Sequence, residues 1–208
     1  MIRLACFDLD GTLVTGTSSF QFIAEKLGFG ELLLEYEAKY RLGVINNIKL
    51  ADETAHLFKG LPIEQIDKLL YDIPKITNIG PTISDLKRRG IVVILASVTW
   101  SFLVEPFART YGFDSYCGTV MQVQKGLLTG EVKTYGTEQD KLEFFIKICQ
   151  NHSITRNQTI AIGDSRSDHL VFRAAGMSIA LNADTSTKEL ATHSIDTDNL
   201  LDIVPFFD

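Results

Sequence analysis

The hydrophobic positions of this chain fall into short apolar runs, separated by longer stretches in which apolar residues recur with helical spacing. The short runs have the length and the flanking turn residues of buried strands. They predict strands at residues 2–8, 91–96, 158–162 and 177–181. The periodic stretches predict helices at residues 80–89, 100–111, 138–151 and 167–175. Strands that alternate with helices are typical of an α/β fold with a parallel sheet.

One long segment departs from this alternation. Between Thr17 and Tyr71 the apolar residues follow a helical pattern throughout, and glycines interrupt that pattern at intervals. Residues 116–132 differ again, because two short strand-like runs flank Lys125-Gly126 and predict a hairpin. The sequence therefore predicts a parallel sheet with a helical insertion after its first strand and a hairpin further along.

Acidic residues follow the first and the third predicted strands at the point where each strand ends. Asp8 and Asp10 precede Gly11, and Asp164 and Asp168 follow the third strand. Buried carboxylates are costly unless something pairs them, and a divalent cation is a suitable partner. Because the carboxyl ends of parallel strands meet at one edge of a sheet, the acids predict a metal site there. Taken singly, an acidic pair after a strand is better explained as a polar turn or a helix cap.

The composition narrows the classes of function. The chain has 208 residues and a net charge of −6, and it contains no basic run, which argues against binding to nucleic acid or to a membrane surface. Its length suits one core domain, or a core domain with a modest insertion. The three cysteines lack CxxC spacing, and no segment has the pattern of a signal peptide or a membrane span. We therefore expect a cytoplasmic protein with reduced cysteines.

Four marks along the chain together resemble the signature motifs of the haloacid dehalogenase superfamily. The strand that ends at Asp8 and Asp10 matches the DxDGT pattern of that superfamily, and Asp164 and Asp168 match its GDxxxD pattern. The remaining two marks are a hydroxyl residue that ends the second strand and a lysine 23 positions before the first GDxxxD aspartate, namely Ser97 and Lys141. The marks occur in the order typical of the superfamily. The helical insertion resembles that of its phosphoserine phosphatase-like branch.

The resemblance implies a definite domain organisation. The core would be a Rossmann-like parallel sheet with helices on both faces, formed by residues 1–14 and 78–208. A small helical cap subdomain, residues 15–77, would be inserted after the first strand. The hairpin predicted at 116–132 is also a feature of this branch.

The resemblance also implies roles for the acidic residues. Asp8 would be the nucleophile that forms an aspartyl phosphate, and Asp10 would be the general acid and base. The metal group would comprise Asp8, Asp10 through its backbone carbonyl, Asp164 and Asp168, with Mg²⁺ as the cofactor. For Asp168 two roles stay open, because it could bind the metal or its waters, or it could orient Lys141.

Ser97, Val98 and Lys141 would bind the phosphate, with Lys133 as an alternative to Lys141. Together these roles imply a Mg²⁺-dependent phosphatase that hydrolyses a small-molecule phosphate monoester. The first alternative is a phosphotransferase or phosphomutase that uses the same aspartate, and the second is a non-catalytic phosphate-binding module. We expect the partner to be a small phosphate ester, neither nucleic acid nor a membrane, and the protein to be a monomer or a homodimer.

Three residues of the insertion are tentative determinants of substrate specificity. A resemblance of residues 59–64 to the cap of the phosphoserine phosphatase-like branch sets the register. Thr17 then stands where that branch has an acid for the substrate amine, and Thr54 stands where it has an arginine for the carboxylate. We therefore expect phosphoserine to be a poor substrate. Arg41 replaces an apolar residue, and it is either a clamp for an anionic part of the substrate or an exposed arginine on a helix.

Overall fold

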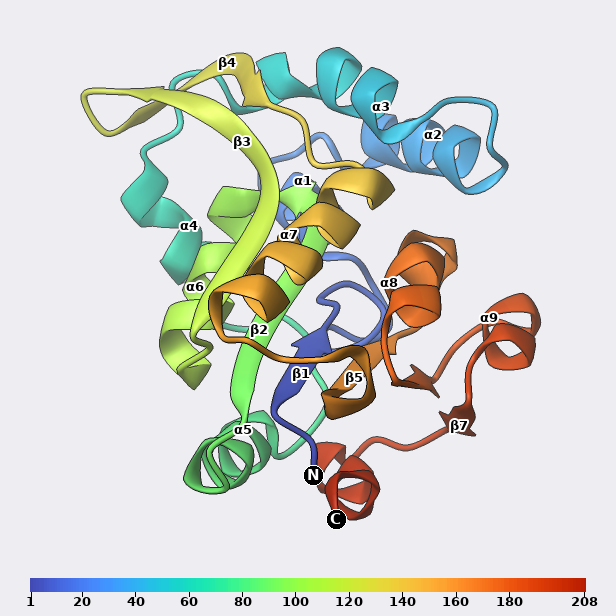
Figure 1. Ribbon diagram of the computed structural model, residues 1–208. Helices are drawn as coiled ribbons and strands as arrows, with labels where there is room; N and C mark the ends of the chain where they lie inside the picture. Colours follow the sequence, from blue (N-terminus) through green and yellow to red (C-terminus); the bar gives the residue numbers. More distant parts are fainter.

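Seven strands form one sheet in the order β4-β3-β2-β1-β5-β6-β7 (Figure 1). The computed structural model describes all residues from 1 to 208. Every neighbouring pair is parallel except β3 and β4, which form the hairpin expected from the sequence. The strands are β1 (Leu4–Phe7), β2 (Val92–Trp100), β3 (Ser115–Gln124), β4 (Leu127–Thr134), β5 (Thr159–Gly163), β6 (Met177–Leu181) and β7 (His193–Ile195).

Strand β1 lies at the centre of the sheet, between β2 and β5. Its four residues are all buried, as expected for an apolar run in a parallel sheet that is covered on both faces. At its carboxyl end, Phe7 stands beside Leu95 of β2 and Ile162 of β5. This register brings the ends of β1 and β5 and the middle of β2 to the same level, so Asp8, Asp164 and Ser97 come from neighbouring positions of the sheet.

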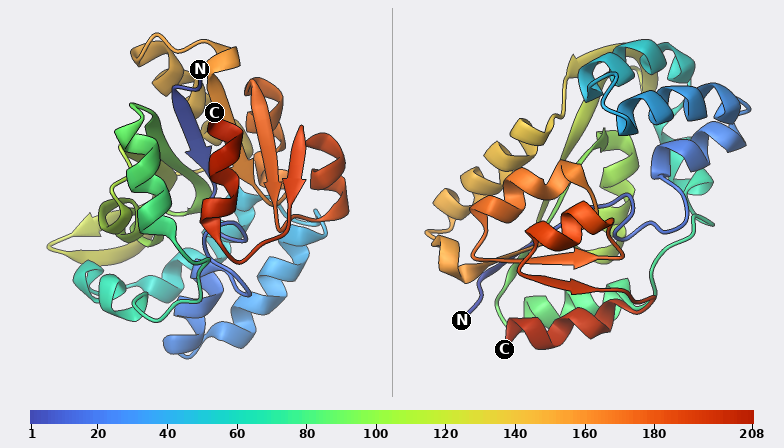
Figure 2. Two further views of the ribbon diagram at one scale, coloured as in Figure 1. Left: turned by 90° about the horizontal axis from the view of Figure 1, so that it is seen from below. Right: turned by 90° about the vertical axis from the view of Figure 1, so that its right-hand side faces the viewer.

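Helices cover both faces of the sheet, which confirms the predicted fold class (Figure 2). Successive residues of β1 point to opposite faces, as the period of a strand requires. Phe7 packs in a core with α5 (Ile79–Arg88), α6 (Ser101–Tyr111) and the C-terminal 3-10 helix η4 (Leu200–Phe207). Cys6 packs in a second core with α7 (Glu138–Asn151) and α8 (His169–Ala174). A short helix, α9 (Thr185–Leu190), precedes β7.

The predicted helical insertion forms four α-helices and one 3-10 helix, called here the cap helices. They are α1 (Ser19–Lys26), α2 (Gly30–Arg41), α3 (Asn47–Thr54), η1 (Ala55–Phe58) and α4 (Ile63–Leu69). They lie at the end of the molecule opposite the two chain termini (Figures 1 and 2). Backbone hydrogen bonds join them to the hairpin, since the Gly60 N–H donates to the Leu128 carbonyl at 2.8 Å and the Leu128 N–H donates to the Leu61 carbonyl at 3.0 Å.

Two predicted elements differ from the observed ones. The strand predicted at 91–96 continues to Trp100, because its far end pairs with β3 and not only with β1. The helix predicted at 167–175 is divided into a 3-10 turn, η3 (Arg166–Asp168), and α8, because the Asp168 side chain binds backbone N–H groups at that turn. The structure contains no helix that is long and apolar enough to cross a membrane.

Candidate active site

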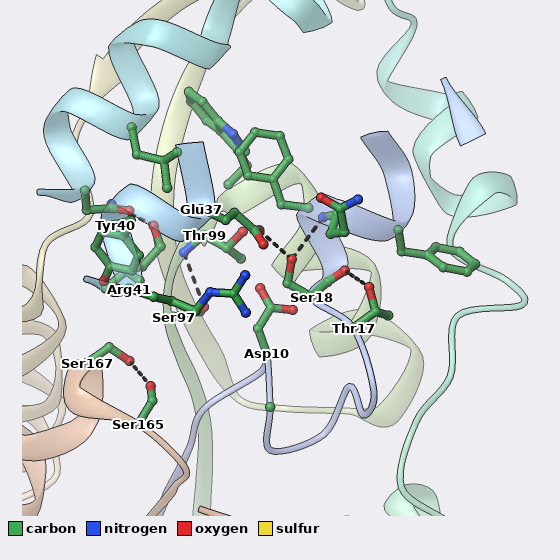
Figure 3. A pocket seen from close by; sticks show the side chains of 18 of the residues that line it. Asp10, Thr17, Ser18, Glu37, Tyr40, Arg41, Ser97, Thr99, Ser165 and Ser167 are labelled. Atoms are coloured by element: carbon green, nitrogen blue, oxygen red, sulfur yellow. Dashed lines mark hydrogen bonds between the residues drawn. The ribbon is translucent and has the colours of Figure 1, made fainter. Parts of the chain in front are cut away.

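The carboxyl edge of the sheet opens into a cavity of about 780 Å³ beneath the cap helices (Figure 3). Three strands bring polar side chains to it: Asp8 follows β1, Ser97 lies in β2, and Asp164 follows β5. These residues are far apart in the sequence and meet because the strands are parallel and in register. The expectation that the strand ends form one site therefore has a direct structural basis.

Lys141 is buried between two carboxylates below this cavity. Its Nζ lies 2.7 Å from Oδ1 of Asp8 and 2.5 Å from Oδ1 of Asp168, and each of the three residues is at most 3% exposed. A capping box at Thr137 begins α7 and places Lys141 on the first turn, facing the sheet. Burial alone would lower the pKa of Lys141, but the charges of Asp168 and Asp8 raise it well above its usual value, so the ammonium stays charged.

The structure also distinguishes between the two candidate lysines. Lys133 lies exposed on β4 and forms no ion pair with Asp8 or Asp168. Lys141 alone is placed next to Asp8.

Asp8, Asp164 and Asp168 each offer a carboxylate oxygen within 4.8 Å of the others, an arrangement that could hold a metal ion. Both oxygens of Asp168 are already engaged, one by Lys141 and the other by the backbone N–H groups of Asp164 and Ser165 at 3.1 and 3.2 Å. The second oxygen of Asp8 and Oδ2 of Asp164 accept no such bond. Asp8 and Asp164 therefore each keep one carboxylate oxygen free of hydrogen bonds, whereas Asp168 contacts Lys141 and the loop after β5.

The charge balance of this acidic cluster also fits a bound cation. Three carboxylates share one ammonium group. Burial raises the pKa of Asp8 to about 7 and the pKa of Asp164 to about 9, and neighbouring carboxylates add to both shifts although Lys141 opposes them. A divalent cation would supply the missing positive charge, and it would restore both groups to their ionised forms.

Gly11 explains why the first motif contains a glycine. Its φ of +88° suits glycine, and a Cβ at this position would lie 2.1 Å from Oδ2 of Asp164. The next residue, Thr12, donates its hydroxyl to Oδ1 of Asp164 at 3.1 Å. The turn after β1 therefore makes room for the carboxylate that follows β5, and orients it.

The Asp10 side chain points into the cavity (Figure 3). Its two oxygens accept hydrogen bonds from the backbone N–H and the hydroxyl of Ser19, at 2.6 and 3.0 Å, on the first turn of α1. Desolvation raises the pKa of Asp10 to about 6, although the hydrogen bonds from Ser19 oppose the shift. Ser19 therefore engages both carboxylate oxygens of Asp10. Asp10 can contribute only its backbone carbonyl to the predicted metal site.

A hydrogen-bonded junction surrounds the end of β2, and it contains a residue that the sequence analysis did not identify. Ser97 is 3% exposed, and the carbonyl of the next residue, Val98, accepts a hydrogen bond from the hydroxyl of Thr119 at 2.9 Å. Asn47, on the first turn of α3, donates its amide to the same carbonyl at 3.0 Å and to the carbonyl of Gly136 at 2.5 Å. The Asn47 side chain thus joins a cap helix to segments next to Ser97 and next to α7. No motif marks it, because its partners are distant in the sequence.

Of the three tentative specificity residues, the structure brings two to the cavity. Thr17 and Arg41 line it, as does Glu37, which the sequence analysis did not single out. Thr54 does not reach the cavity, because its side chain is fully buried and its hydroxyl donates to the Leu50 carbonyl at 2.7 Å. A sequence register gives the position of a residue along a helix but does not establish that its side chain faces a pocket.

Comparisons with known proteins agree with this arrangement. Residues 5–173 match the family model of the haloacid dehalogenase-like hydrolases. The phosphoserine phosphatase of Methanocaldococcus jannaschii is 30% identical over 205 residues, which are 98% of this chain and 97% of that protein. The phosphoserine phosphatase of Archaeoglobus fulgidus is 28% identical over 200 residues, which are 96% of this chain but only 58% of that protein.

Solved structures of phosphoserine phosphatases have the same fold as this chain. One contains an analogue of the phospho-aspartyl intermediate; it has a TM-score of 0.86 and 30% identity, and the match covers 100% of this chain and 99% of that one. A substrate-bound complex has a TM-score of 0.87 and 29% identity, with the same coverage.

Proposed function

This chain belongs to the haloacid dehalogenase-like hydrolases, and from that membership we propose that Asp8 is the nucleophile of a Mg²⁺-dependent phosphatase. The enzyme hydrolyses a small-molecule phosphate monoester through an aspartyl-phosphate intermediate. One observation carries the assignment of the nucleophile: Asp8 has one oxygen fixed by Lys141 at 2.7 Å, and it lines the cavity with its other oxygen unpaired. An ionised carboxylate held in this way can attack phosphorus without a general base.

The reaction divides into two displacements. In the first, the free oxygen of Asp8 bonds to phosphorus, the bond from phosphorus to the alcohol oxygen breaks, and Asp10 gives its proton to that oxygen. In the second, Asp10 takes a proton from water, the water oxygen bonds to phosphorus, and the bond to Asp8 breaks to release inorganic phosphate. The raised pKa of Asp10, about 6, suits a group that must both give and accept a proton near neutral pH.

Mg²⁺ would be held by Asp8, Asp164 and the backbone carbonyl of Asp10. When bound, it neutralises charge on the phosphate and lowers the repulsion between that group and Asp8. Lys141 stabilises the charge that spreads over the phosphate oxygens, and Asp168 positions Lys141.

Ser97 and the backbone N–H groups from Val98 onward donate to the phosphate in this proposal. We also propose that residues 15–77 form a cap subdomain on a core of residues 1–14 and 78–208. The protein would work in the cytoplasm, as a monomer or a homodimer, and all three of its cysteines are free.

The two alternative functions, a phosphotransferase or phosphomutase and a non-catalytic phosphate-binding module, gain no support from the relatives. The proteins and structures matched above are phosphatases, which favours hydrolysis over transfer to a second hydroxyl group. The intact set of charged residues at the cavity favours catalysis over simple binding. For phosphoserine itself we keep the expectation of poor turnover, because the neutral Thr17 lines the cavity where an acid would be needed for the substrate amine.

The test is phosphate release from a panel of phosphomonoesters, measured with Mg²⁺ and with a chelator. We expect release that requires Mg²⁺ in the native enzyme and that is lost in Asp8→Asn. Asp72→Asn is the matched control, because this aspartate is exposed on the surface. Release that persists in Asp8→Asn, or that is equal with and without metal, would contradict the proposal.

A further inference from the structure

The cavity extends well beyond the space that a phosphate group needs. Its volume of about 780 Å³ lies within the range of pockets that bind whole small molecules. Asp8 lies at its inner end, and α1 and α2 form much of the opposite wall. The residues of that wall therefore face the alcohol part of a bound phosphate ester.

The lining of this cavity is mostly acidic where it is charged. Its carboxylates are Asp8, Asp10, Glu25, Glu37 and Asp164. Among the lining residues, Arg41 is the only lysine or arginine. Figure 3 shows its side chain extending from α2 toward the space in front of Asp10.

Arg41 has no partner of its own, although other basic residues nearby are engaged. Its guanidinium forms no ion pair and no hydrogen bond with another side chain or a carbonyl. By contrast, Lys39 pairs with Glu35 at 2.6 Å on the same helix. Arg166 pairs with Glu138 at 3.3 Å and lies over the ring of Tyr40.

Glu37, one turn before Arg41, interacts with it only at a distance: burial raises the pKa of the Glu37 carboxyl, and the charge of Arg41 opposes that shift. The Glu37 carboxylate accepts the hydroxyl of Ser18 at 2.7 Å and makes no ion pair with Arg41. Arg41 is thus an exposed residue of α2 that also lines the cavity, and its donors are available to a ligand there.

We propose that the preferred substrate is a phosphate monoester whose alcohol part carries a carboxylate, and that Arg41 binds this carboxylate. The inference rests on the proposed phosphatase function. A guanidinium presents a planar fork of N–H donors that matches the two oxygens of a carboxylate. The other charged residues of the lining are acidic and repel the substrate carboxylate. Arg41 therefore also determines which end of the substrate faces the cap helices.

The experiment compares matched pairs of esters at three lengths. Each pair has a carboxylate in one member and a neutral hydroxymethyl group in the other: phosphoglycolate with ethylene glycol phosphate, 3-phosphoglycerate with glycerol 3-phosphate, and 4-phosphoerythronate with erythritol 4-phosphate. We expect kcat/KM to favour the carboxylate member at one or more lengths by about 10- to 100-fold, the usual range for a charge-assisted hydrogen bond. Most of the difference should lie in KM.

Two variants separate a direct contact from a general effect of charge. Arg41→Ala should remove the preference for the carboxylate member, because it lowers kcat/KM for that member by a larger factor than kcat/KM for the neutral member. Lys39→Ala changes the net charge equally on the same helix, but Lys39 does not line the cavity, so it should keep the preference. Arg41→Lys should restore only part of it, because an ammonium lacks the planar fork.

The failures of the two proposals are distinguishable. Equal kcat/KM for both members of every pair, or equal losses in Arg41→Ala and Lys39→Ala, would overturn the role of Arg41 while the phosphatase stands. Absence of any phosphate release that depends on Asp8 would overturn the phosphatase proposal itself.

Discussion

We predict that the Asn47 amide helps to hold the cap helices closed over the cavity, in addition to the backbone hydrogen bonds that join them to the hairpin. It donates to the Val98 carbonyl at 3.0 Å and to the Gly136 carbonyl at 2.5 Å, across the space between α3 and the sheet. A typical hydrogen bond contributes about 0.5–1.5 kcal/mol net, so the two together contribute about 1–3 kcal/mol to the closed arrangement. Their loss should lower the equilibrium constant for closure by about 5- to 150-fold.

Two substitutions test this energy. Asn47→Ala removes both donors, and Asn47→Asp has a larger effect because it places a carboxylate against two carbonyl oxygens. Asn46→Asp is the matched control: it adds the same charge one residue away, and an aspartate there can still accept the Lys49 N–H that caps α3.

The only tryptophan of the chain reports on closure without reference to activity. Trp100 is 2% exposed, and two cap residues, Phe20 and Phe58, cover it with ring centroids at 6.3 and 6.1 Å. Acrylamide should quench its fluorescence more strongly in Asn47→Ala and most strongly in Asn47→Asp. KM for the best ester should rise in the same order, while Asn46→Asp should match the native enzyme in both measurements. Unchanged quenching together with unchanged KM in folded Asn47→Asp would refute the reasoning.

Three further predictions concern the chemistry. Asp10→Asn should lower kcat/KM, which reports only the steps up to release of the alcohol, by about 10²–10⁴-fold for an alkyl phosphate. It should affect kcat/KM for p-nitrophenyl phosphate much less, because that leaving group needs no proton; equal losses of kcat/KM would exclude Asp10 as the acid. Gly11→Ala should abolish the stabilisation by Mg²⁺ in thermal melts, because its Cβ would lie 2.1 Å from the Asp164 carboxylate. Gly16→Ala is the control: this glycine has a similar φ of +74° but no close neighbour, so the variant should retain the stabilisation. The pKa of Asp8 is raised to about 7 and that of Asp164 to about 9, so these groups bind protons more tightly in the folded than in the unfolded state. The stability of the metal-free protein should therefore fall as pH rises from about 4 toward 9. Mg²⁺ displaces those protons, so its gain in Tm should be larger at about pH 8 than at about pH 6, and a gain that does not vary with pH would contradict this.

The parts of the fold that the sequence predicted are those with local signals. The run before Asp8 is apolar because β1 is buried on both faces, and a short apolar run between turn residues is visible without any alignment. Parallel strands then place the acids at one edge, so the acidic cluster followed from the order of elements. The segment after Leu181 gave no such signal, because β7 spans only His193–Ile195 and is largely exposed.

The parts of the site that escaped prediction depend on tertiary contacts. Asn47 is 51 residues from Val98 and 89 residues from Gly136, and an isolated asparagine at the start of a helix suggests only a cap. Ser19 holds Asp10 because α1 begins beside the first loop, which the apolar pattern does not show. Thr54 was placed by register alone, and its buried side chain shows that register does not decide which face of a helix meets a cavity.

The buried lysine has a consequence for the way the chain acquires activity. Lys141 is 133 positions from Asp8 and 27 positions from Asp168, so the three charges meet only after most of the chain has been synthesised. Contacts between residues distant in sequence form slowly, because closing the intervening loop costs conformational entropy. A nascent chain that ends before residue 141 therefore exposes the nucleophile without its counter-ion Lys141 and without its neighbouring strand β5. Recovery of activity during refolding would then mark the final long-range pairing of the sheet, later than the collapse of either core.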